Sequence, residues 1–220
     1  MASEPEPEKI WDEYDWERFL QQQDRKTERY MELLEKYLDD PNRDQIIARE
    51  MGWNHFLDED GQDWANDVDE HFTEASCEEG DACEEGDESV EESVERHPLY
   101  TASLELSLWI DELLATRKDL ENIPLAVQLS TQCAVAGAKL AAALCDDDVD
   151  EIGMTIAYLK RALKAATLAL NAAMELQNKS VLTSSQGQTL NQRLFQIRDA
   201  IIALMGDYRA EWRRRYGENH

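Results

Sequence analysis

The segment Val149–Gln177 constrains the fold of this chain most strongly. Its core-type residues recur at alternating steps of four and three: Ile152, Ile156, Leu159, Leu163, Ala166, Leu170 and Ala173. This spacing keeps one stripe on one side of an α-helix and is typical of a helix packed lengthwise on another helix. At about 1.5 Å per residue the helix would be roughly 40 Å long, so its stripe requires partners of similar length.

The flanking segments supply such partners. Pro98 suits the first turn of a helix that carries Leu99, Ser103, Leu106, Ile110 and Leu113. Pro124 opens the next helix, with inward positions Leu125, Leu129, Cys133, Ala136, Leu140, Ala143 and Leu144. Thr183–Gln186 resembles a capping box before a last helix that carries Leu190, Leu194, Ile197, Ile201, Leu204 and Tyr208. Short links between long helices favour antiparallel neighbours. The chain is therefore predicted to be all-α, with an antiparallel up-down-up-down four-helix bundle over about 98–216.

Alanine is concentrated on the two middle helices of this bundle. These alanines are Ala134, Ala136, Ala138, Ala141, Ala142, Ala143, Ala162, Ala165, Ala166, Ala169, Ala172 and Ala173. They indicate either close helix approach or a second face that is covered by the N-terminal helices or by another subunit. A homo-oligomer is one of the assemblies that this pattern leaves open.

Charge divides the chain into two unlike halves. Residues 1–97 contain 33 acids and 9 bases, a net charge of −24, whereas residues 98–220 have a net charge of −2. Such asymmetry indicates an acidic arm attached to a nearly neutral fold. We predict four parts: an N-terminal helical extension (1–57), an acidic linker with a candidate short helix (58–97), the four-helix bundle (98–216) and a tail (217–220). The extension should contain helices from Lys9 to Leu38 and from Arg43 to Met51.

The charge and hydropathy patterns weigh against several functions. A net charge of −26 repels phosphate backbones, so binding to nucleic acid or to anionic membranes is not expected. No apolar run approaches the ~20 residues of a membrane span. The N-terminus lacks both the basic start and the apolar core of a secretory signal, which predicts a cytoplasmic protein.

Candidate metal ligands lie mainly in the acidic linker. Glu91, Glu92 and Glu95 match the first half of the Glu-Glu-x-x-Glu pattern of the all-α nucleotide pyrophosphatases, but no Glu-x-x-Asp follows. A charged helical lead into the bundle is the simpler interpretation. Asp58, Asp60 and Asp63 resemble part of a calcium loop whose first ligand position would be apolar, so they are weak candidates for divalent binding.

Catalytic constellations are otherwise absent from the sequence. No Glu-x-x-His occurs, and no His lies within a bundle helix. Arg215 and His220 have the Arg-x4-His spacing of the HEPN ribonucleases, but the motif straddles Gly217 at the chain end. The simpler role of these arginines is charge at a helix C-terminus. We predict no catalytic residue and no cofactor.

The sequence therefore favours a non-enzymatic helical-bundle protein that acts through protein contacts, with an acidic arm suited to a basic partner. Four tryptophans in the acidic half, Trp11, Trp16, Trp53 and Trp64, are candidate partner contacts, and packing onto the bundle is their alternative role. Two alternatives remain. One is an enzyme, either a metal-dependent nucleotide hydrolase or a HEPN-like ribonuclease, and the other is an acidic mimic of nucleic acid.

Overall fold

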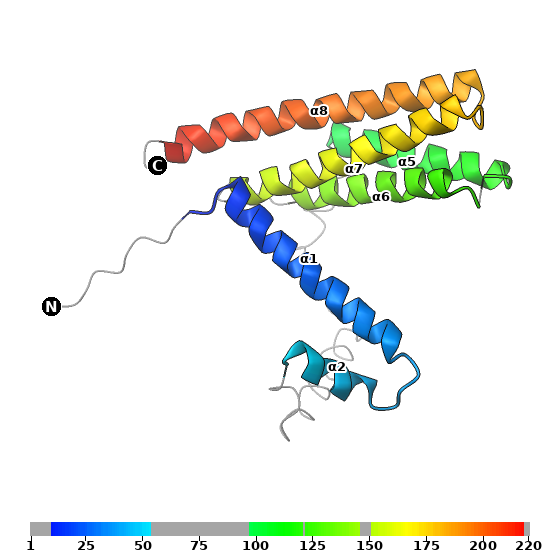
Figure 1. Ribbon diagram of the computed structural model, residues 1–220. Coiled ribbons are helices and arrows are strands. Elements are labelled where there is room, and N and C mark those ends of the chain that lie inside the picture. The colour runs from blue at the N-terminus through cyan, green and yellow to red at the C-terminus, as the bar shows by residue number, and fades with distance from the viewer. Residues whose placement is uncertain (1–9, 54–96, 121, 146–150, 218–220) are drawn as a thin grey trace, which may run out of the picture. The chain divides into compact units, whose positions relative to one another are not determined.

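The computed structural model describes residues 10–53, 97–120, 122–145 and 151–217, and these residues form six α-helices without strands (Figure 1). The chain divides by its internal contacts into two compact units. One comprises Met1–Glu17 with Gly86–His220, and the other comprises Arg18–Glu85.

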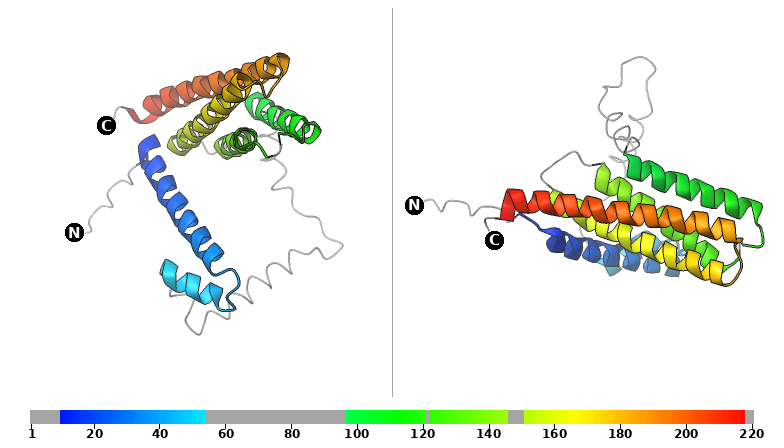
Figure 2. Two further views of the ribbon diagram at one scale, coloured as in Figure 1. Left: turned by 45° about the vertical axis from the view of Figure 1, so that its right-hand side comes forward. Right: turned by 90° about the horizontal axis from the view of Figure 1, so that it is seen from above.

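The first unit contains four long helices: α5 (Pro98–Thr116), α6 (Pro124–Leu144), α7 (Ile152–Asn178) and α8 (Ser184–Tyr216). Helix α5 packs against α6 and α8, α6 packs against α7, and α7 packs against α8. Consecutive helices run in opposite directions (Figure 1), and the turned views show the four helices side by side (Figure 2). The prediction of an all-α helical bundle is confirmed.

Local signals fix where the bundle helices begin. The His97 side chain accepts a hydrogen bond from the Leu99 backbone N–H at its Nδ1 (3.2 Å), and Pro98 occupies the first turn of α5. The capping box predicted at the start of α8 is present, because the side chains of Thr183 and Gln186 each accept from the other's backbone N–H.

Helix α7 is the most deeply embedded of the four helices. Its predicted stripe is buried apart from Leu163, which is partly buried against the core. A second set of α7 residues is also buried, because α6 and α8 flank this helix on two sides: Thr155, Ala157, Ala162, Ala165, Ala169, Ala172 and Leu176. The α7 alanines therefore serve close helix approach.

The other core predictions are mostly correct. All five predicted α5 positions are buried. On α6, Ala126 occupies the buried position that the sequence assigned to Leu125, which is only partly buried. On α8, Met205 is buried, while the predicted Leu204 and Tyr208 lie at the edge of the core. At Leu125 and Leu204 the buried residue is the next one along the helix, whereas Leu144 and Tyr208 are partly buried positions near the helix ends.

The N-terminal half contains α1 (Glu13–Lys36) and α2 (Arg43–Met51). Helix α1 begins after the predicted Lys9, because the Asp12 carboxylate accepts hydrogen bonds from the backbone N–H groups of Tyr14 and Asp15 (2.8 Å each). The polar segment 21–26 is helical, so one continuous helix covers most of the range predicted from Lys9 to Leu38. Helix α2 has its predicted bounds and ends at Gly52, whose φ of 75° is left-handed.

Candidate functional site

All of the sequence-predicted metal ligands lie outside the described residues. This applies to Glu91, Glu92, Glu95, Asp58, Asp60 and Asp63, and also to Trp64. Within the described ranges, no group of three or more His, Cys, Asp or Glu side chains is arranged to hold a metal ion. Of the HEPN-like pair, Arg215 donates a hydrogen bond to Glu211 one turn earlier on α8, and His220 lies outside the described residues.

Two of the four tryptophans lie at the end of the bundle where α7 begins. The rings of Trp11 and Trp16 meet edge to face with centroids 4.9 Å apart. Gly153 on α7 is in close contact with both residues. A Cβ added there would be 2.5 Å from the Trp11 carbonyl oxygen and 2.9 Å from Trp16 Cδ1. Glycine at this position therefore permits the N-terminal segment to contact the α7 backbone. Trp11 remains 40% exposed, so packing accounts for only part of its surface.

Trp53 lies in the second unit, just after α2. Its ring stacks on Tyr30 of α1 with centroids 5.9 Å apart and an interplanar angle of 27°. The side chain is 37% exposed. Its role as a partner contact stays a prediction, as it does for Trp11 and Trp16.

An ion-pair cluster joins the N-terminal segment to α7 and α8. The Glu13 carboxylate accepts hydrogen bonds from Arg209 Nε (3.2 Å) and Nη2 (2.8 Å), and Lys160 Nζ lies 3.8 Å from it. One turn further on, Glu17 accepts from Arg161 Nε at 3.2 Å. The hydrogen bond from Arg209 to Glu13 raises the pKa of the guanidinium. Because each acid is matched by a cation of the bundle, this cluster anchors residues 12–17.

A groove of about 630 Å³ separates the first half of α5 from α8. Its floor is apolar and includes Leu99, Ile197 and Leu204. Small side chains widen it, among them Ala102, Ala200 and Ala203, and its rims carry His97, Glu105, Arg193 and Asp207. The rims thus mix both signs of charge and contain no nucleophile paired with a base. This composition suits an apolar contact better than a reaction.

The outer side of α6 departs from the acidic character of the chain, whereas the neighbouring outer side of α5 exposes Glu105, Asp111 and Glu112. Helix α6 carries one charged residue in its 21 positions, Lys139, whose ammonium lies 5.7 Å from the ring centroid of Tyr158 on α7. We define the α5/α6 face by seven side chains: Leu104, Leu108, Val127, Thr131, Ala134, Val135 and Ala138. Its large members are substantially exposed, at 44% for Leu104, 60% for Leu108, 51% for Val127 and 37% for Val135.

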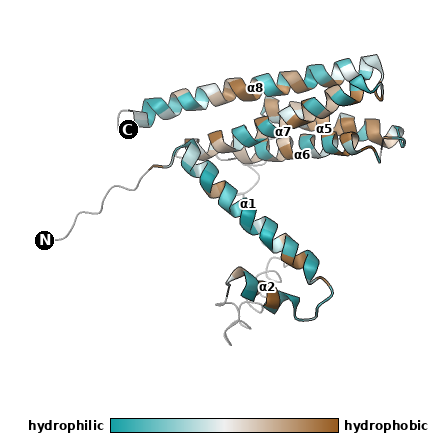
Figure 3. Cartoon of the chain, viewed as in Figure 1, coloured by the Kyte–Doolittle hydropathy of each residue, from teal (hydrophilic) through white to brown (hydrophobic). Residues whose placement is uncertain are grey.

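Two contacts between α5 and α6, beside this face, hold the two helices in register. Ser130 Oγ donates a hydrogen bond to Asp111 Oδ1 (3.4 Å), and a Cβ added at Gly137 would lie 3.5 Å from Ser103 Oγ. Figure 3 shows the contrast in hydropathy between these helices and α1, whose residues are mostly hydrophilic. The sequence interpretation missed the α5/α6 face, although the near absence of charge from α6 was visible in the sequence.

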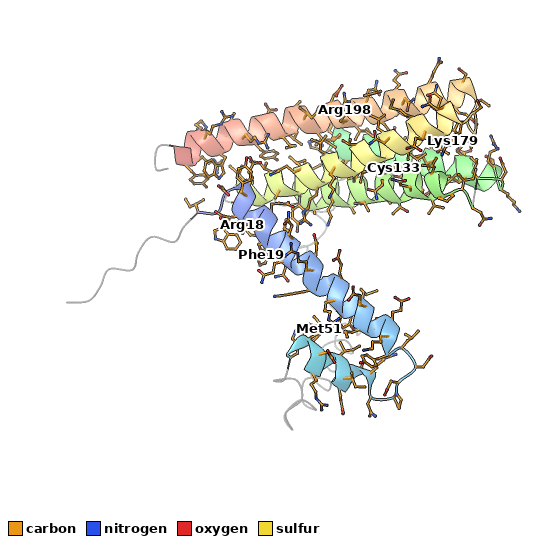
Figure 4. All side chains as sticks on the ribbon, in the orientation of Figure 1. Arg18, Phe19, Met51, Cys133, Lys179 and Arg198 are labelled. Atoms are coloured by element: carbon orange, nitrogen blue, oxygen red, sulfur yellow. The ribbon has the colours of Figure 1, made fainter. Side chains whose placement is uncertain are left out.

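The one cysteine on the inner side of α6 is not a nucleophile. Cys133 is buried in the bundle (Figure 4), and this burial raises the pKa of its thiol to about 12. A thiol with so high a pKa stays protonated near neutral pH and is unreactive. Cys133 therefore serves as a small apolar core residue.

Comparison with models of known protein families, with curated proteins and with solved structures finds no match to this chain. No helix that the structure describes combines the length and the apolar character that crossing a membrane requires.

Proposed function

We propose that this protein is a non-enzymatic helical-bundle protein that acts through contacts with other proteins, and that the α5/α6 face is its main contact surface. The observation that carries this proposal is the composition of α6, which has a single charge in 21 residues although its outer side is exposed. The whole chain is 32% charged, so solvent-facing helices would be expected to carry several charges. Contiguous exposed apolar surface on a folded chain marks an interaction site.

The acidic N-terminal half has a separate role in the proposed function. Two of its acids, Glu13 and Glu17, form ion pairs with cations of α8 and α7. Residues 1–97 as a whole have a net charge of −24, and a field of this strength attracts a basic protein and speeds its association. We assign long-range attraction to the acidic half and close contact to the α5/α6 face.

Affinity capture from the source cells tests the proposal. Three tagged full-length chains serve as baits. The first is the wild type, and the second carries Leu104→Glu and Leu108→Glu on α5. The third is a control that carries Met174→Glu on α7 and Ile202→Glu on α8. Both control side chains are exposed to a similar extent, at 46% and 49%. The proposal expects at least one protein that the wild type and the control retain and the α5/α6 variant loses. Identical sets of retained proteins for all three baits would contradict it.

A further inference from the structure

An apolar stripe on the outer side of α5 has acidic margins. Leu104 and Leu108, one helical turn apart, are 44% and 60% exposed. Glu105 is exposed on the margin towards α8, where it lines the groove between the two helices, and Glu112 follows on the same margin two turns later. Asp111 is exposed on the margin towards α6, from which it accepts a hydrogen bond. The two leucines of α5 therefore lie between acidic residues on both sides.

The acids on these margins have no ion-pair partner among the residues that the structure describes. Helix α5 contains neither Lys nor Arg. Arg193 of α8 lines the groove beside Glu105, but its guanidinium lies over the ring of Trp109, 5.5 Å from the ring centroid. The three carboxylates are therefore available to cations of a partner.

This arrangement defines the chemistry of the partner that fits the face. An exposed apolar stripe between acidic margins is complementary to an amphipathic helix whose apolar side is bordered by Lys or Arg. We infer that the α5/α6 face binds a basic amphipathic helix of a partner protein, which lies lengthwise over α5 and α6. This inference rests on the proposed role of the α5/α6 face in protein contacts and adds the class of partner.

The outer side of α6 provides space for such a helix beside the α5 leucines. The hydrogen bond between Ser130 and Asp111 fixes the register of the two antiparallel helices, so the leucines lie level with Ala134 and Ala138 of α6. Both alanines are exposed. Because their side chains are short, a partner helix can approach α6 closely and place larger apolar side chains against the α5 leucines.

The acids also set the spacing of the partner's cations. Glu105 and Glu112 are seven residues apart, which places them about 10 Å apart along the axis of α5. A helix that lies lengthwise over α5 matches this distance with Lys or Arg seven positions apart on one margin. A cation on its other margin meets Asp111. The partner should therefore carry cations at helical spacing on both sides of its apolar stripe.

Charge favours this partner over a second copy of the chain. A second copy would bring its own Glu105, Asp111 and Glu112 to the same interface, and acids facing acids oppose association. The net charge of −26 adds repulsion at long range between two copies. The same net charge attracts a basic helix, so long-range attraction and the margins of the face select for the same sign of charge.

Binding of a designed peptide to the full chain tests the inference. The probe is a fluorescein-labelled peptide of Leu, Ala and Lys, about 18 residues long so that it can form a helix, with leucines along one side and lysines on both margins. A second peptide has the same composition in an order that gives no apolar side. Fluorescence anisotropy at about 0.15 M NaCl measures both dissociation constants. The second peptide should bind at least about ten-fold more weakly, because it cannot cover the leucines.

Three variants locate the binding site of the amphipathic peptide. Leu104→Gln/Leu108→Gln should weaken binding by at least about ten-fold, because apolar burial is lost without a change of charge. Glu105→Gln/Glu112→Gln should weaken it by about three- to ten-fold, because two exposed ion pairs are lost. The control Glu28→Gln/Glu35→Gln removes two exposed acids of the same spacing from α1 and should change binding by less than about two-fold. Circular dichroism should show unchanged helix content in all three.

Equal weakening by the α5 and α1 glutamine variants would overturn the inference, because the peptide would then respond to net charge alone. Equal binding of the two peptides would also overturn it, as would a wild type that dimerises through Leu104 and Leu108 and leaves the peptide unbound. The proposed function would still stand in these cases if affinity capture finds a protein that the Leu104→Glu/Leu108→Glu bait loses, so the two failures can be told apart.

Discussion

Glu13 and Arg209 lie 196 positions apart in the sequence and are joined by hydrogen bonds of 2.8 and 3.2 Å to one carboxylate oxygen. The Glu13 side chain is only 13% exposed, whereas that of Arg209 is 40% exposed. The N-terminal segment is therefore part of the bundle structure up to residue 17, and the charge division along the sequence is not a structural boundary.

Arg209→Ala should destabilise the first unit. The substitution leaves the largely buried Glu13 carboxylate with Lys160 as its remaining cation, at 3.8 Å. An under-satisfied buried acceptor of this kind costs about 1–3 kcal/mol, and partial solvation of Arg209 favours the lower end. The free energy of unfolding in urea measures the effect. Arg198→Ala is the control, because its partner Asp199 is 62% exposed, and a surface pair contributes about 0–1 kcal/mol. Equal losses for the two variants would contradict the anchoring role of Glu13.

Gly153→Ala should also destabilise the protein, for a steric reason. The new methyl group would be 2.5 Å from the carbonyl oxygen of Trp11, so the N-terminal segment must move away from α7. Overpacking of this kind typically costs about 1–3 kcal/mol.

The matched substitution is Gly206→Ala on α8, where no atom lies within 4 Å of the new methyl group. It should stabilise the helix by about 0.4–1 kcal/mol, because alanine loses less backbone entropy than glycine on folding. Thermal unfolding of both variants measures the difference. If Gly206→Ala destabilised the protein and Gly153→Ala left its stability unchanged, the proposed packing of Trp11 against Gly153 of α7 would be contradicted.

Cys133 should resist alkylation while the protein is folded. Burial raises the pKa of its thiol to about 12, whereas Cys145 at the end of α6 is exposed. Peptide-level mass spectrometry after brief iodoacetamide treatment at pH 8 should find Cys145 modified and Cys133 unmodified. The thiol favours the folded state below its ordinary pKa of 9.0, and this contribution is lost as the pH rises from there towards 12. Rapid modification of Cys133 in the folded protein would contradict its place in the core.

Glu211 should titrate well below the ordinary pKa of a glutamate carboxyl. Hydrogen bonds from Arg214 and Arg215 lower the pKa of its carboxyl from 4.5 to about 2. A lowered pKa stabilises the folded state above pH 4.5, and the contribution is lost as the pH falls from 4.5 to about 2. NMR titration of the side-chain carboxyl measures the midpoint. In an Arg214→Ala/Arg215→Ala variant the midpoint should return towards 4.5, and an unchanged midpoint would rule out these hydrogen bonds as the cause.

The bundle helices could be predicted from the sequence because their signals are local. The spacing of Leu99, Leu106 and Ile110 identifies the buried side of α5, and Thr183 and Gln186 mark the start of α8. The second buried side of α7 could not be predicted in this way. Alanine occurs at both exposed and buried helix positions. Whether a given alanine is buried depends on how closely the neighbouring helices approach.

The contacts of the N-terminal segment were beyond prediction for a different reason. Glu13 is one of 33 acids in the first 97 residues, and no local pattern shows which acid meets Arg209.

The α5/α6 face could be predicted from the sequence in part. Only Lys139 is charged between Pro124 and Leu144, and this signal is present in the sequence. The sequence alone does not show which α6 residues face solvent. The structure does, because it separates the buried alanines of α6 from the exposed Ala134 and Ala138.

Site-specific photo-crosslinking in the source cells tests most directly the claim that the α5/α6 face contacts proteins. A photoreactive phenylalanine derivative would replace Leu108 on this face in one chain and Ile202 on α8 in another, since both side chains are exposed. We predict that irradiation joins the chain to another protein at position 108 and gives little product at position 202. Equal yields at the two positions, or no protein adduct at position 108, would contradict the account.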